Sequence, residues 1–190
     1  KVKHQVLSRS KRSDYDVLRI LSDVSGNTIP NAKLNLLNYD LTIDGVSRII
    51  LSDSHNVQIF PDGGRIVMKK NRDFDFSGMV AAGRSEFFGS EFEFKYDDFI
   101  IDMPIVDSLQ LWAQTNQKDK NGNKLEARVQ TIIEDLQGEL KIDRSNNKSG
   151  LKSIKKYPEF ISEKESYAYY DHGFVHDKVY SRDKFYFQLE

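Results

Sequence analysis

Aromatic and aliphatic residues recur at every second position along residues 74–102, FDFSGMVAAGRSEFFGSEFEFKYDDFIID. Successive side chains of a β-strand point to opposite faces, so a period of two predicts strands with one apolar face and one wet face. Gly78, Gly83 and Gly89 interrupt the run every five or six residues, and we expect bends or bulges there. This segment therefore predicts β structure in several short pieces.

The same pattern continues on both sides of this segment. Residues 16–23 fit a strand or a short helix equally well, whereas the sequence Pro61-Asp62-Gly63-Gly64 predicts a hairpin because its glycines tolerate a positive φ. Residues 125–136 allow an amphipathic helix or a strand, and Gly138 with the ELKID that follows favours a hairpin and thus the strand. Further strands are expected near 34–36, 41–46, 48–51, 56–60, 65–70, 108–113 and 184–190.

These patterns predict an all-β fold with little helix, in which many short strands form a curved double layer. A β-roll or solenoid and a β-sandwich both fit the spacing of the strands. We expect residues 1–15 to be a disordered or extended lead-in and residues 16–190 to be a single domain. The chain starts without methionine and stops inside an expected strand, which suggests a fragment of a longer protein. The expected core includes Val80, Phe87, Phe92, Phe94, Phe99, Ile101, Leu109 and Leu111.

Composition narrows the range of functions. The chain has 28 basic and 29 acidic residues, so a net charge of −1 provides no field that would attract nucleic acid. It has no cysteine, which excludes disulfides and thiolate metal sites. No apolar run approaches the roughly 20 residues that span a bilayer as a helix, so we expect no membrane insertion.

Two segments contain residue types that bind metals. Asp119, Asn121 and Asn123 match the first oxygen ligands of a calcium loop, but the glycine and the glutamate that such a loop requires are replaced by Lys124 and Gln130. A polar hairpin turn explains the same residues, so we expect no cofactor, with calcium as the alternative. His172 and His176 have the spacing of zinc ligands on a helix, but the neighbouring glycine and tyrosines argue against a helix, and surface or structural histidines are the alternative.

The last part of the chain is rich in tyrosine. Tyr167, Tyr169, Tyr170 and Tyr180 could form an exposed platform that stacks on sugars or anchors a protein partner. An aromatic core layer beneath the last strands is the alternative. Carbohydrate processing would also need two facing carboxylates, and Glu91 and Glu93 instead alternate with phenylalanines as the wet face of a strand does.

Four phrases resemble an internal segment of very large, functionally unassigned proteins from Bacteroidota. They are GVSRIILSDSHNVQIFPDGG (45–64), KKNRDFDFSGMVAAGRSEFFGSEFEFKYDDFIID (69–102), DRSNNKSGLK (143–152) and YAYYD…YSRDKFYFQLE (168–190). The resemblance implies a longer parent protein and a cell-envelope or exported location, and it supplies no catalytic residues. The phrase FSGMVAAGRSEF is also similar to the β-roll repeats of lipopolysaccharide-transport proteins of the OstA type.

No catalytic constellation stands out in the sequence. We therefore expect a non-enzymatic structural or binding module of a larger surface or envelope protein, whose partners are other domains of the parent chain or separate proteins. A carbohydrate-binding or carbohydrate-processing domain is the first alternative, with glycans as ligands. Lipid or lipopolysaccharide handling inside a β-roll is the second, and it predicts a continuous apolar channel.

Overall fold

The computed structural model describes residues 2–9, 17–24, 31–169, 179 and 181–189. Within these residues the chain forms fourteen strands and one short 3-10 turn, which confirms the predicted all-β class. Residues 2–9 of the expected lead-in form a paired strand. The segment 16–23, which fits a strand or a short helix, lies almost entirely in a second strand, Val17–Val24.

The larger sheet is antiparallel and has eleven strands. Their order is β1-β2-β5-β6-β8-β9-β10-β11-β13-β14, and β12 also pairs with β11. The bounds are β1 Val2–Arg9, β2 Val17–Val24, β5 Val46–Ser52, β6 Val57–Pro61, β8 Phe74–Ala82, β9 Ser85–Lys95, β10 Ile100–Lys118, β11 Lys124–Lys141, β12 Glu159–Ser162, β13 Ser166–Tyr169 and β14 Tyr186–Leu189.

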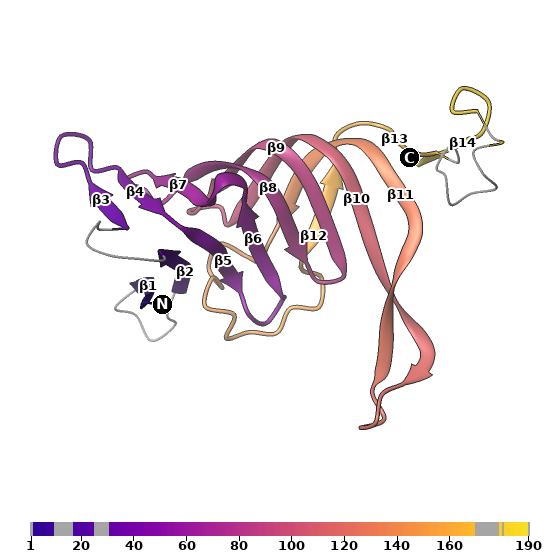
Figure 1. Cartoon of the computed structure of the whole chain (residues 1–190), viewed down its shortest axis with the longest axis horizontal. Helices are drawn as coiled ribbons and strands as arrows, with labels where there is room; N and C mark the ends of the chain where they lie inside the picture. Colours follow the sequence, from indigo (N-terminus) through magenta and orange to yellow (C-terminus); the bar gives the residue numbers. More distant parts are fainter. Residues whose placement is uncertain (1, 10–16, 25–30, 170–178, 180, 190) are drawn as a thin grey trace.

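A second sheet has three short strands, β3 Ala32–Leu34, β4 Leu41–Asp44 and β7 Arg65–Met68, in the order β3-β4-β7. Figure 1 shows the larger sheet as a curved layer that is not closed into a barrel, with the small sheet at one end of the molecule. The hairpin of β10 and β11 extends well beyond the other strands (Figure 1). The architecture is thus an open, curved β structure of the roll or sandwich type.

One row of apolar residues crosses the larger sheet from strand to strand. Each member is the direct cross-strand partner of the next: Ile20, Ile49, Ile59, Val80, Phe87, Leu109, Ile133, Ala168 and Phe187. We call this set the central row. From Ile20 to Leu109 its members are at most 8% exposed. Burying one such side chain contributes about 1.5–3 kcal/mol, so the row is a main source of stability.

A second apolar row lies beside the first and consists mainly of phenylalanine. Phe74, Phe94, Ile101, Leu140 and Phe160 pair in turn across β8, β9, β10, β11 and β12. The rings of Phe74 and Phe94 lie 5.0 Å apart and both are fully buried. Of the predicted core residues, all are buried except Leu111, which is partly buried against the core.

The predicted hairpin at Pro61–Gly64 is wrong. Gly63 and Gly64 do have a positive φ, but the turn connects two sheets, because β6 pairs with β8 and β7 pairs with β4. The local sequence specifies the turn, whereas the partner of each flanking strand is chosen by residues further along the chain. The turn therefore directs the chain from the large sheet into the small one.

The strand interpretation of residues 125–136 is confirmed, but no hairpin begins at Gly138. β11 continues through this glycine. The position suits glycine because the backbone of β12 lies so close that an added β-carbon would be 2.1 Å from the carbonyl oxygen of Ile161. Gly89 has the same role between β9 and β10, next to a shift in strand register. Gly78 also lies at a register shift, between β8 and β9, so these two glycines mark the predicted irregularities.

We expect Gly89→Ala to lower the free energy of unfolding by about 3 kcal/mol or to prevent folding. The added β-carbon would lie 2.1 Å from the carbonyl oxygen of Ile105 and 3.0 Å from the Cα of Val106, which are both backbone atoms of the neighbouring strand. Gly122→Ala is the control, because no atom lies within 4 Å of its added β-carbon. It should cost only the strain of its positive φ, about 1 kcal/mol. Equal urea midpoints for the two variants would contradict this account.

Candidate functional site

The outer face of the larger sheet carries a row of carboxylates. Asp75 is the cross-strand partner of Glu93, Glu93 is the partner of Asp102, and Asp102 is the partner of Glu139. Like charges directly opposite each other on a sheet are destabilising. This row therefore needs compensation from cations nearby.

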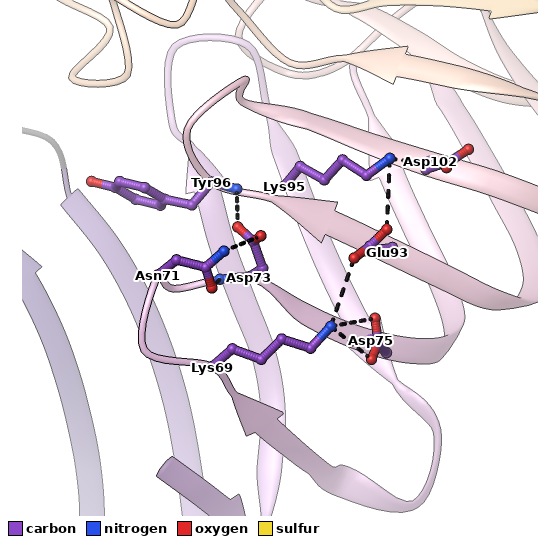
Figure 2. Close-up of polar contacts among 8 residues, drawn as sticks. All are labelled: Lys69, Asn71, Asp73, Asp75, Glu93, Lys95, Tyr96 and Asp102. Atoms are coloured by element: carbon purple, nitrogen blue, oxygen red, sulfur yellow. Dashed lines mark hydrogen bonds and ion pairs between the residues drawn. The ribbon is translucent and has the colours of Figure 1, made fainter. Parts of the chain in front are cut away.

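Two lysines, Lys69 and Lys95, lie between three of these carboxylates, Asp75, Glu93 and Asp102, as Figure 2 shows. Lys69 Nζ lies 3.1 Å from Asp75 and 3.6 Å from Glu93, and Lys95 Nζ lies 3.6 Å from Glu93 and 3.1 Å from Asp102. The hydrogen bond to Asp75 raises the pKa of Lys69, and the hydrogen bond to Asp102 raises the pKa of Lys95. Both lysines thus remain protonated, and the row is an alternating charge ladder.

The charge ladder does not have the properties of a glycosidase site. Such a site needs one carboxyl group in an apolar setting that keeps it protonated. The side chains of Asp75, Glu93 and Asp102 are instead 65%, 36% and 41% exposed, and each faces a lysine. The ladder is best explained as the solvated face of the sheet.

A buried polar cluster holds the loop that follows β11. Asp143 accepts hydrogen bonds from the backbone nitrogen of Arg144 at 2.6 Å and from Asn147 Nδ2 at 2.7 Å. Its other contact is His55 Nε2 at 3.0 Å, and the two side chains are only 1% and 7% exposed. Asn147 also binds the carbonyl and the nitrogen of Lys152, at 2.8 Å and 3.0 Å.

This cluster contains the histidine–carboxylate half of a catalytic triad, but its contacts are those of a structural clamp. Every donor to Asp143 belongs either to the loop itself or to the turn between β5 and β6 that the loop covers. No local pattern predicts the pair, because His55 and Asp143 are 88 positions apart. Only the turn-rich composition of residues 143–150 was visible.

Two of the four tyrosines proposed for the platform, Tyr167 and Tyr169, lie on β13 next to Tyr186 on β14. The rings of Tyr167 and Tyr169 stack at 6.0 Å with 25° between their planes, and Tyr186 lies 5.7 Å from Tyr167 at 74°. With Arg182 and Asp183 these rings line a shallow hollow of about 340 Å³. Tyr170 and Tyr180 lie outside the described residues. Tyr186 is an addition that sequence reasoning missed.

The tyrosine rings do not form a flat, open platform. The guanidinium of Arg182 lies 3.6 Å from the centre of the Tyr169 ring and also pairs with Glu134 on β11. The hydroxyl of Tyr167 donates to Glu165 at 3.0 Å, which raises the pKa of Tyr167, and burial raises the pKa of Tyr169. Tyr186, half exposed, is the ring with the most surface available to a ligand.

The proposed calcium ligands form the turn of the β10–β11 hairpin. The Asp119 carboxylate accepts from the backbone nitrogens of Asn121 and Asn123, both at 2.8 Å, and from Asn123 Nδ2 at 3.1 Å. The hydrogen bonds from Asn123 lower the pKa of Asp119. This geometry favours the hairpin-turn interpretation, because the carboxylate is already occupied by donors of its own turn.

His172 and His176, the proposed zinc ligands, lie outside the described residues. In the described part of the chain, no group of three or more His, Asp or Glu side chains is arranged to hold a metal ion.

Comparisons with protein families, with curated proteins and with solved structures found no match. The functional argument therefore rests on the geometry of this chain.

We expect Asn147→Ala to lower the free energy of unfolding by about 2–4 kcal/mol, because it leaves buried partners of the amide without hydrogen bonds. Asn146→Ala is the matched control, since Asn146 is exposed in the same loop. Its effect should be within about 0.5 kcal/mol. Urea unfolding measures both values, and trypsin should cut the loop at Lys148 and Lys152 faster in Asn147→Ala alone. Equal effects of the two substitutions would contradict the clamp.

Proposed function

We propose that this chain is a non-enzymatic structural and binding module of a larger surface or envelope protein. The observation that carries the proposal is the end of the central row. Phe187 is its member on β14, the last strand in the sheet order, and it is 59% exposed. The earlier members are buried or, at Ile133, partly buried, so the apolar row becomes exposed at this edge of the sheet.

The edge of β14 complements this exposed apolar face. In the described residues β14 pairs only with β13, so its other edge presents backbone donors and acceptors. An extended peptide can pair with such an edge and place an apolar side chain over Phe187. Another segment of the parent protein, or a separate protein partner, would bind in this way. The parent protein and its envelope location are inferences from the sequence resemblance.

A photo-crosslinking amino acid at position 187 tests this proposal in cells that produce the parent protein. We expect a crosslink to one discrete protein or to one distant segment of the parent, because the binding strand would lie directly over this side chain. The control places the same amino acid at Gln117, which is exposed on the β10–β11 hairpin. No product from position 187, or the same products from both positions, would contradict the proposal.

Carbohydrate binding is a second candidate, favoured by the hollow that Tyr167, Tyr169 and Tyr186 line. One exposed ring at an angle to two stacked rings suits the apolar face of a single sugar at a chain end. Lipid handling inside a β-roll is less well supported, because buried phenylalanines such as Phe74, Phe92 and Phe94 fill the apolar core. A continuous channel would need that space.

We expect a terminal-sugar glycan to bind the chain weakly and Tyr186→Ala to weaken that binding at least about tenfold, because stacking on this ring is lost. A glycan array followed by calorimetry on the best binder would measure it. Tyr39→Ala is the matched control, since Tyr39 is also half exposed but lies in the turn between β3 and β4. An array without binders, or equal losses in both variants, would remove this candidate.

A further inference from the structure

The turn between β3 and β4 exposes two large apolar side chains that are adjacent in the sequence. Leu36 is 74% exposed and Leu37 is 94% exposed. Leu34 and Tyr39, on either side of them, are about half exposed at 51% and 54%. Figure 1 shows this turn projecting at one end of the long axis of the molecule. We call Leu34–Tyr39 the leucine tip.

The leucine tip satisfies many of its own backbone groups. The nitrogens of Asn35 and Tyr39 bond to the carbonyls of Asp40 and Asn35, at 2.9 Å and 2.8 Å. The side chain of Asn35 accepts from the nitrogen of Leu37 at 2.9 Å, and that of Asn38 accepts from the nitrogen of Asp40 at 3.1 Å. Backbone groups that are satisfied within the turn lose little when the turn enters an apolar medium.

Groups suited to a membrane interface surround the two leucines. Lys70, from the turn after β7, lies with its Nζ 5.3 Å from the centre of the Tyr39 ring. Lys33 is exposed on β3. The nearest acid of the turn, Asp40, accepts a hydrogen bond from Asn38 at 2.6 Å. Tyrosine and lysine are the residues that prefer the headgroup region, where the ring lies at the interface and the ammonium meets anionic lipid.

We propose that the leucine tip binds a lipid surface that contains anionic headgroups. Leu36 and Leu37 enter the outer acyl region, Tyr39 lies at headgroup level, and Lys33 and Lys70 contact lipid phosphates. The tip is convex and projects, which suits a deformable bilayer better than a preformed protein groove. In the described residues no helix is long and apolar enough to cross a bilayer.

The first experiment measures co-sedimentation of the chain with vesicles of phosphatidylcholine, with and without phosphatidylglycerol. We expect binding to the anionic vesicles, and Leu36→Ser with Leu37→Ser should weaken it at least about tenfold. Leu151→Ser is the matched control, because Leu151 is 68% exposed in a different loop. Lys33→Gln with Lys70→Gln should reduce binding to anionic vesicles only. Circular dichroism and thermal unfolding should be unchanged in all of these variants.

A second experiment uses the absence of cysteine from the chain. Leu37→Cys and Leu151→Cys each provide one attachment point for an environment-sensitive fluorophore. Anionic vesicles should shift the emission of the probe at position 37 to the blue and leave the probe at position 151 unchanged. Lack of vesicle binding by the unmodified chain, or equal shifts at both positions, would overturn the proposal and leave a protein partner as the occupant of the tip.

Discussion

The structure depends on direct cross-strand packing along the central row. Nine strands, from β2 to β14, each contribute one apolar residue to it, and the pairing of neighbouring strands fixes their order. A slip of one residue in any pair would turn that strand's apolar side chains to the wet face. Each buried member contributes about 1.5–3 kcal/mol, whereas an exposed ion pair contributes about 0–1 kcal/mol. The apolar row therefore sets the register, and the charged face adapts to it.

The charge ladder shows this adaptation. Once the apolar side is in register, Asp75, Glu93 and Asp102 become direct neighbours on the other face, an arrangement that alone would be unfavourable. Lys69 and Lys95 lie between them and offset the repulsion, and the same contacts raise the pKa of both lysines. The pairing of charges on this face is thus a consequence of the core, which is why a functional interpretation of these acids is unnecessary.

The period of two in the sequence was sufficient to predict the strands and most of the core, because alternation is a local property of the chain. Strand partners are not local. The turn at Pro61–Gly64 has the composition of a hairpin turn, yet it connects two sheets, and Gly138 serves the close approach of β12 rather than a turn. The clamp of His55 and Asp143 was invisible for the same reason. Tyr167 and Tyr169 could be proposed because tyrosines are dense in the last part of the sequence.

The open form of the sheet gives the two proposed contacts separate places. In Figure 1 the leucine tip lies at one end of the long axis and β14 at the other. The leucine tip belongs to the small sheet and β14 to the large one, so neither contact occupies the surface of the other. A protein strand on β14 and a lipid surface at the leucine tip could therefore be bound at the same time. The closed alternative, a barrel, would have no free edge and would lose the first of these contacts.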